Sequence, residues 1–178
     1  FFSNSFTGSG TEGEIVRELD ASRYNTRFID TSRTYQGKTY YTTVRAQCVG
    51  GTLVHAYVRA RDVEDGAPSV HAKDTPLIPD LIETFQRDLV DQHIGAIKDI
   101  AVKIADAVGP GFFAHDLLID QNDNVFVTET NTKIVDLDYL RRIRSIVDDL
   151  PSHHWMTTDE YPRRVAQAFA IEMDRLTD

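Results

Sequence analysis

Three oxygen-bearing side chains in the second half of the chain have the types and the spacing of a metal site. Asp116 lies within one apolar run, and Glu129 and Asn131 lie within the next. Residues 121–124, which separate the two runs, read Gln-Asn-Asp-Asn and favour a turn. The sequence therefore predicts a tight hairpin with acidic or amide side chains on both strands.

The register of this hairpin decides whether the three side chains meet. If those four residues form the loop, Asp120 pairs with Val125, and counting back places Asp116 opposite Glu129. Opposed residues share a face, and so does Asn131, two residues further on. Facing carboxylates repel unless a cation lies between them, and hard oxygen ligands suit Mg²⁺ or Mn²⁺. The alternative is that these side chains simply occupy the solvent side of a hairpin.

Residues 39–61 predict a second hairpin, because the Gly-Gly pair at 50–51 suits a two-residue turn with positive φ. Its strands carry Arg45, Arg59 and Arg61, whose guanidinium forks match phosphate or carboxylate groups. In a regular hairpin with this turn, Arg45 faces one side and the other two face the opposite side. All three can serve one ligand only if a bulge intervenes. Exposed charges on a sheet edge are the alternative.

The rest of the pattern predicts an α+β fold with a mostly antiparallel sheet and helices packed across it. An apolar stripe at helical spacing covers 81–108, with Gly95 as a candidate break, and a Gly-Pro-Gly sequence ends it at 109–111. Residues 62–79 predict a long loop. The other expected elements are a helical turn at 14–19, strands at 24–30, 39–49, 52–61, 112–120 and 125–131, and helices at 138–147 and 159–176.

The composition is that of a globular protein. A chain of 178 residues can form one domain with its own core, and 26% charged and 41% hydrophobic residues are ordinary values. The net charge of −9, without a basic run, argues against general binding to nucleic acids or anionic membranes. Cys48 is the single cysteine, and neither a signal-peptide pattern nor a long apolar run is evident. We therefore expect a cytoplasmic protein.

Three segments resemble elements of the ATP-grasp superfamily. Residues 113–120 and 125–132 resemble its metal hairpin, in which an aspartate on one strand and Glu-x-Asn on the next hold magnesium against the phosphates of ATP. The strand–Gly-Gly–strand at 41–54 is similar to a second element, in which Arg45 would be the arginine before the turn. Residues 24–30 resemble the segment whose backbone meets adenine. The three segments occur in the order found in the family.

The resemblance implies an ATP- and Mg²⁺-dependent ligase that joins a small-molecule carboxylate to an amine or thiol through an acyl phosphate. Small-molecule kinase activity toward an alcohol, and a catalytically degenerate nucleotide-binding or scaffold domain, are the alternatives. Both a monomer and an oligomer remain open. The implied residues are Asp116, Glu129 and Asn131 for the metal, Arg45 and Arg59 for catalysis, and Arg27, Phe28, Ile29, Asp30, His71 and Lys73 for the nucleotide.

The chain departs from the family pattern at three points. Thr26 and Arg27 occupy the stretch where an acid usually precedes the aromatic residue of the adenine segment. Ala114 stands where ligase members often carry an oxyanion-stabilising arginine, and Thr132-Lys133-Ile134 replaces the usual small residues and proline. Charge in a transition state would then need another donor, and the substrate subclass is open. We expect a single domain that is incomplete at its N-terminus. Its parts would be a mobile lid remnant at 1–23, a core with the metal hairpin at 24–135, and C-terminal helices at 136–178.

Overall fold

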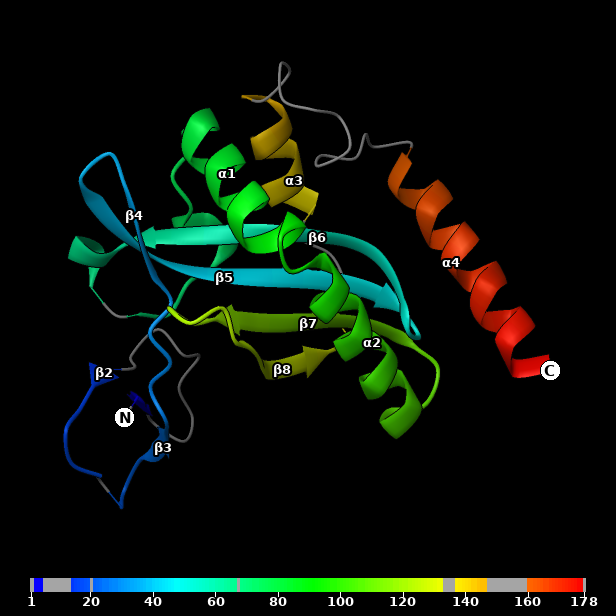
Figure 1. The fold of residues 1–178 in the computed structure, drawn as a ribbon, viewed down its shortest axis with the longest axis horizontal. Helices are drawn as coiled ribbons and strands as arrows, with labels where there is room; N and C mark the ends of the chain where they lie inside the picture. The colour runs from blue at the N-terminus through cyan, green and yellow to red at the C-terminus, as the bar shows by residue number, and fades with distance from the viewer. Residues whose placement is uncertain are drawn as a thin grey trace.

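The computed structural model describes residues 2–4, 14–19, 21–66, 68–132, 137–146 and 160–177. This part of the chain has an α+β fold, with helices packed on a curled antiparallel sheet, as the sequence predicts (Figure 1). Part of the expected lid remnant, including residues 5–13, lies outside the described residues.

The main sheet is built around one long strand. β5 (Lys38–Val49) has β6 (Thr52–Asp62) on one side and two shorter strands in succession on the other. β4 (Ser32–Tyr35) pairs with the first part of β5, and β7 (Phe112–Ile119) pairs with the second part. β8 (Val125–Asn131) pairs with the outer side of β7. β6 and β8 therefore lie at opposite edges of the sheet, and both carry candidate site residues.

A smaller described sheet has the order β2-β1-β3. Its strands are β1 (Phe2–Asn4), β2 (Glu14–Ile15) and β3 (Tyr24–Thr26). The predicted helical turn at 14–19 is wrong, because residues 14 and 15 pair with β1 instead. The predicted strand at 24–30 is too long, since β3 ends at Thr26 and the chain then leaves the small sheet.

The transfer from the small sheet to the large one is fixed by a pair of threonines. Thr31 precedes β4, and its hydroxyl accepts from the Thr42 N–H at 3.3 Å. The Thr42 hydroxyl in turn donates to the Thr31 carbonyl at 2.8 Å. Arg33 of β4 then reaches across to β7, donating to the carbonyl of Asp120 at 2.7 Å. These contacts span distant parts of the sequence, and the sequence pattern did not predict β4.

The predicted helix at 81–108 is two helices joined by a wider turn. α1 (Pro79–Phe85) continues into a π-helical stretch, Gln86–Asp91, and α2 (Ile94–Val108) follows. Gly95 is not the break, because the turn lies at residues 92–93 and Gly95 belongs to the first turn of α2. The remaining described α-helices are α3 (Leu137–Arg144) and α4 (Glu160–Thr177), both close to their predicted bounds.

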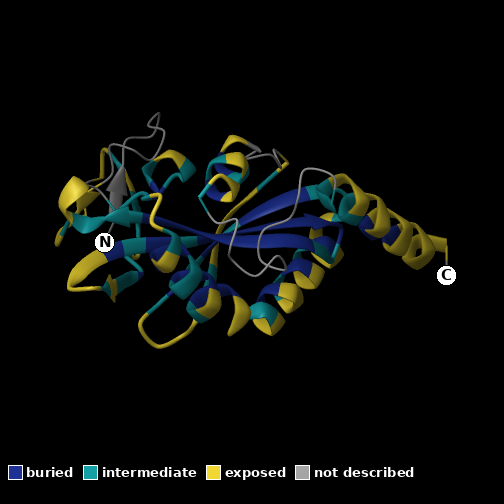
Figure 2. Cartoon of the chain, turned by 90° about the horizontal axis from the view of Figure 1, so that it is seen from above, coloured by how far each residue is buried: buried dark blue, intermediate teal, exposed yellow. Residues whose placement is uncertain are grey.

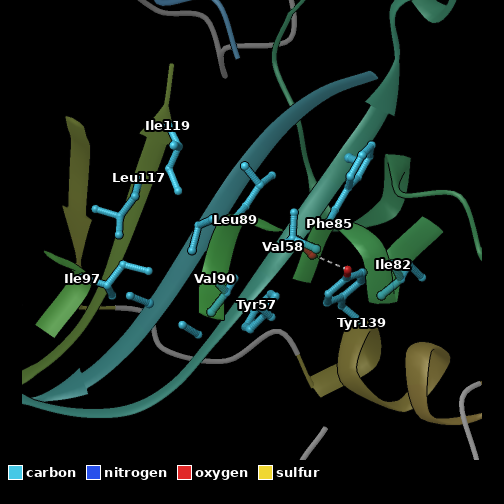
Figure 3. Close-up of a cluster of buried hydrophobic side chains, with 14 of the residues drawn as sticks. Tyr57, Val58, Ile82, Phe85, Leu89, Val90, Ile97, Leu117, Ile119 and Tyr139 are labelled. Carbon is cyan, nitrogen blue, oxygen red and sulfur yellow. Dashed lines mark hydrogen bonds between the residues drawn. The ribbon is translucent and has the colours of Figure 1, made fainter. Parts of the chain in front are cut away.

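Alternate residues of β5 divide the main sheet into two faces. Val44, Ala46 and Cys48 belong to the core cluster formed with α1, the π-helical stretch and α2, part of which is drawn in Figure 3. Burial raises the pKa of the Cys48 thiol to about 12, so this cysteine is a protonated core residue at neutral pH. Arg45 and Gln47 point to the other face, where the candidate site lies.

Side chains rather than another strand close the outer edge of β6. Gln86 Nε2 donates to the carbonyl of Ala56 at 2.9 Å, and Gln86 Oε1 accepts from the Val58 N–H at 3.1 Å. The hydroxyl of Tyr139 in α3 donates to the Val58 carbonyl at 2.6 Å, as the dashed line in Figure 3 shows. Unpaired backbone groups at a sheet edge invite pairing with another chain. These contacts satisfy them and hold β6 in place.

α4 docks on the β5–β6 turn through one of its sides. Glu172 Oε1 accepts from the Gly51 N–H at 3.1 Å and from the Thr52 hydroxyl at 3.0 Å. Gly50 has a φ of +53°, and a Cβ there would lie 2.3 Å from Glu172 Oε2, so the turn requires glycine. Much of the rest of α4 is exposed (Figure 2), and no described helix combines the length and apolarity needed to cross a bilayer.

Candidate functional site

The β7–β8 hairpin places the two predicted carboxylates opposite each other. Asp116 pairs with Glu129, and Asn131 pairs with Ala114 at the next position of the same face. All three predicted metal ligands therefore belong to one face of the sheet, as the sequence predicts. This face is opposite to the one covered by α1 and α2.

The predicted register is nevertheless wrong near the turn. Val125 pairs with Ile119 rather than with Asp120, whose carboxylate instead accepts from two loop N–H groups at 2.8 and 2.9 Å. A one-residue bulge further along restores the predicted pairing, because Thr128 is an extra residue in β8. The Thr128 hydroxyl donates to the carbonyl of Asp116 at 2.9 Å. The predicted opposition of the two acids thus depends on a bulge that the sequence did not reveal.

A second bulge determines where the arginines point. In β6, Val54 is the extra residue, since the register shifts between its two neighbours. As a result Arg45 pairs with Tyr57, and Arg59 and Arg61 follow at alternate positions on the same face. A regular hairpin would have put them on opposite faces. The bulge that the arginines required to serve one ligand is therefore present.

The two arginines converge on one carboxylate. Arg45 Nη1 lies 3.2 Å from both oxygens of Asp116, and Arg59 Nη2 lies 2.7 Å from Asp116 Oδ1. The three side chains are 10%, 6% and 15% exposed for Arg45, Arg59 and Asp116. With Glu129 on the next strand, the group has two positive and two negative formal charges. We refer to Arg59, Arg45, Asp116 and Glu129 as the ionic row.

Burial and neighbouring charges act in opposite directions on Asp116. Desolvation raises the pKa of its carboxyl above the ordinary value, and Glu129 adds to this rise. The charges of Arg59 and Arg45 lower the pKa but do not cancel the effect of burial. A buried carboxylate thus depends on its two guanidinium partners.

The outer strand presents the remaining oxygen donors to solvent. Glu129 is exposed and Asn131 is half-buried, and Asn131 Nδ2 donates to Glu129 Oε1 at 2.6 Å. Two carboxylates and an amide oxygen are the donor types that Mg²⁺ and Mn²⁺ prefer. The described residues contain no group of three His, Cys, Asp or Glu side chains suited to a metal ion. The donor set fits a hard cation that keeps several water ligands.

The structure revises one premise of the sequence prediction. Opposed carboxylates were expected to need an external cation, but Arg45 and Arg59 already supply positive charge beside Asp116. Glu129 is exposed, so water stabilises its charge as well. Electrostatics alone therefore does not demand a metal ion, and any ion at Asp116 would share that carboxylate with guanidinium groups.

The segment predicted to meet adenine lies further along the sheet. Arg27, Phe28, Ile29 and Asp30 form an irregular stretch between β3 and β4, with Phe28 and Ile29 half-buried. Asp30 Oδ1 accepts from the N–H of residue 32 at 2.9 Å, which shapes the entry into β4. Residue 32 pairs with residue 41 of β5, four residues or about 13 Å from Arg45 given the rise per residue of a strand. The segment is not part of the ionic row.

The loop after β6 carries the other predicted nucleotide contacts. His71 Nε2 lies 3.2 Å from the Ser69 hydroxyl, and Lys73 is exposed. Arg61 organises this loop, because its guanidinium donates to the carbonyl of Ser69 at 3.2 Å and to that of Asp65 at 2.7 Å. Since Arg61 follows Arg59 on the same face, the loop borders the ionic row at its β6 end. His71 and Lys73 are therefore placed beside the row rather than within it.

Two side chains of this face were missed by the sequence analysis. Gln47 is 1% exposed and lies one step along β5 from Arg45 on the same face. Tyr57 is fully buried opposite Arg45, with its ring 5.2 Å from that of Tyr139 in α3. Gln47 lies two residues after Arg45, so alternation along β5 could have revealed it. Tyr57 reaches this face only because of the bulge in β6. His115 lies on the opposite face, where its ring contacts Thr130, consistent with a structural role.

Comparisons with protein-family models, with curated proteins and with solved structures find no match.

Proposed function

We propose that the ionic row binds the phosphates of ATP together with a divalent cation, as part of an ATP-grasp-type ligase. The observation that supports this most is the convergence of Arg45, Arg59, Asp116 and Glu129 on one sheet face. Guanidinium groups are suited to phosphate oxygens, and carboxylates are suited to the cation that accompanies them. Val54 of the β6 bulge also packs in a small apolar cluster with Val49 and Ala168, and both bulges are needed to assemble the row.

In the proposed reaction, a substrate carboxylate attacks the terminal phosphorus of ATP, and ADP leaves. An amine or thiol then attacks the resulting acyl carbon, phosphate departs with its electron pair, and the nucleophile loses a proton. Asp116, Glu129 and Asn131 would hold Mg²⁺, which neutralises phosphate charge during transfer. Arg45 and Arg59 would bind phosphate oxygens and orient them for attack. Arg59 would supply the positive charge that ligase members often obtain from an arginine at the position of Ala114.

A non-catalytic phosphate-binding module is the second candidate. It is favoured by the ion pairs that Asp116 makes with both arginines, since they satisfy the carboxylate without a metal. It is also favoured by Ala114 at the position of the family's oxyanion arginine. The two candidates share ATP binding but differ in turnover.

Calorimetric titration with ATP, in Mg²⁺ and then in EDTA, tests the proposed site. Glu129→Gln is the first variant, because Glu129 is exposed and its loss leaves the Arg–Asp pairs intact. We expect Mg²⁺-dependent ATP binding that weakens by at least about tenfold in this variant, a scale seen when groups around a metal are removed. Asp99→Asn is the matched control, since it removes one exposed charge from α2 on the other face.

Equal ATP binding with and without Mg²⁺, or equal loss in both variants, would refute the metal site. Ligase activity is tested separately by adding hydroxylamine, which traps an acyl phosphate as a hydroxamate. Hydroxamate formed from a panel of carboxylates supports the ligase, a phosphorylated alcohol supports a kinase, and binding without turnover supports the phosphate-binding module.

A further inference from the structure

The ionic row has a property that a plain metal site lacks, because its central carboxylate is already engaged. Asp116 Oδ1 accepts hydrogen bonds from Arg59 Nη2 at 2.7 Å and from Arg45 Nη1 at 3.2 Å. Asp116 Oδ2 accepts one from Arg45 Nη1 at 3.2 Å. Both oxygens that a cation could use therefore lie beside guanidinium groups. We propose that Arg45 and Arg59 prevent a cation from binding Asp116. A phosphate-bearing anion removes this block by binding the guanidinium groups in place of Asp116.

This inference rests on the proposed function and adds to it that cation binding depends on anion binding. Mg²⁺ binds carboxylate oxygens at about 2.1 Å, so an ion on Asp116 Oδ1 would lie less than about 5 Å from Arg59 Nη2 in its present position. Like charges at that separation repel strongly in a site that is largely shielded from water. A cation alone must therefore displace at least one guanidinium group from Asp116.

Displacement without a replacement anion is unfavourable for these side chains. Arg59 and Arg45 are only 6% and 10% exposed, so a guanidinium that leaves Asp116 does not simply enter water. Arg59 is also anchored on its other side, since its Nε donates to the Thr43 hydroxyl at 3.2 Å. A phosphate group supplies the missing counter-charge and accepts two parallel hydrogen bonds from each fork.

Cation and anion binding therefore assist each other. The anion frees Asp116 by binding the two arginines. The cation then neutralises negative charge on the anion and on the two carboxylates. Because linkage is reciprocal, each ligand must raise the affinity for the other by the same factor. The ionic row consequently disfavours free metal ions and free phosphate and selects the two together.

The test measures Mn²⁺ alone, which avoids the complex that Mn²⁺ forms with polyphosphates in solution. Mn²⁺ binding to the whole chain is followed by the loss of the free-ion electron paramagnetic resonance signal. In Arg59→Gln one guanidinium group no longer contacts Asp116. We therefore expect Mn²⁺ affinity to rise by about tenfold, within the usual range of coupling between sites. Circular dichroism verifies that the variant is folded.

Arg61→Gln is the matched control. It removes the same charge from the same face of β6, but Arg61 donates to carbonyls of the neighbouring loop rather than to Asp116. We expect its Mn²⁺ affinity to match that of the wild type. If both variants tighten Mn²⁺ equally, the effect is general electrostatics and the inference is wrong.

Further results would also overturn the inference. Unchanged or weaker Mn²⁺ binding in Arg59→Gln, in a protein whose wild type binds ATP with Mn²⁺, refutes this inference but leaves the proposed function standing. No Mn²⁺ binding by any form, with or without ATP, refutes both. Should Arg59→Gln fail to fold, Arg45→Gln removes the other guanidinium group from Asp116. A gain in Mn²⁺ affinity of about tenfold is then expected, and no gain refutes the inference.

Discussion

β6 and β8 are outer strands of the same sheet, yet they are held in very different ways. Residues 54–60 of β6 are all buried, and its outward backbone groups are bonded by Gln86 and Tyr139. Residues 127–130 of β8 are all exposed. Each strand nevertheless contains a bulge, and each delivers a charged side chain to Asp116.

The difference indicates that Arg59 and Glu129 have different roles in the ionic row. Arg59 comes from a strand whose backbone is bonded on both sides, so the point from which its side chain extends is largely set before a ligand arrives. Among the described residues no strand pairs with the outer side of β8, so Glu129 can adjust to an ion of a given size. Local stability differs across a structure in this way, and binding elements are often drawn from its less stable parts. Three pairs of substitutions test this contrast through the stability of the folded protein.

The largest effect is expected for Asp116→Ala. This substitution leaves the guanidinium groups of Arg45 and Arg59 close together without their shared counter-charge, which should lower the free energy of unfolding by about 3 kcal/mol. Glu129→Ala on the exposed strand should change it by less than about 0.5 kcal/mol. Urea denaturation followed by circular dichroism measures both. Equal losses would show that the two sides of the row are equally rigid.

A smaller effect is expected when the closed edge of β6 is opened. Gln86→Leu removes the partners of the Ala56 carbonyl and the Val58 N–H, and we expect a loss of about 2 kcal/mol from these buried polar groups. Gln92→Leu is the control, because Gln92 is an exposed glutamine in the following turn. The same urea titration applies, and a loss in the control as large as in Gln86→Leu would contradict the assigned role.

The smallest effect compares two hydroxyls that each donate to a strand carbonyl. Tyr139→Phe leaves the buried Val58 carbonyl without this donor and should cost about 1 kcal/mol. Thr128→Val removes the donor to the Asp116 carbonyl on the exposed strand, where water can replace it, so we expect less than about 0.5 kcal/mol. Thermal unfolding of the two variants measures the difference, and a reversed order would remove the distinction between the strands.

Local patterns were sufficient to predict both hairpins. The Gly-Gly turn at 50–51, the helical stripe before Gly109 and the polar loop after Asp120 each reflect short-range preferences that a sequence displays directly. The same alternation argument failed for Arg45 and Arg59, because alternation assumes a regular ladder. A single extra residue, Val54, reverses its conclusion for everything that follows in the strand.

The opposition of Asp116 and Glu129 was predicted correctly, but for an incomplete reason. The loop takes in Asp120, which shifts the pairing by one, and Thr128 then shifts it back. Contacts between distant segments were beyond sequence reasoning altogether. Examples are the bond from Arg33 to the Asp120 carbonyl and the bond from Gln86 to β6, which depend on how the whole chain packs.

The hydrogen bond between Glu172 and Gly51 has a consequence for synthesis of the protein on the ribosome. The two residues are 121 positions apart, so the turn emerges long before the helix that caps it. At about 5–20 residues per second, the interval is about 6–24 s. During that time the turn lacks the Glu172 carboxylate, and the hairpin relies on its own ladder and on the strands and helices that emerge before α4.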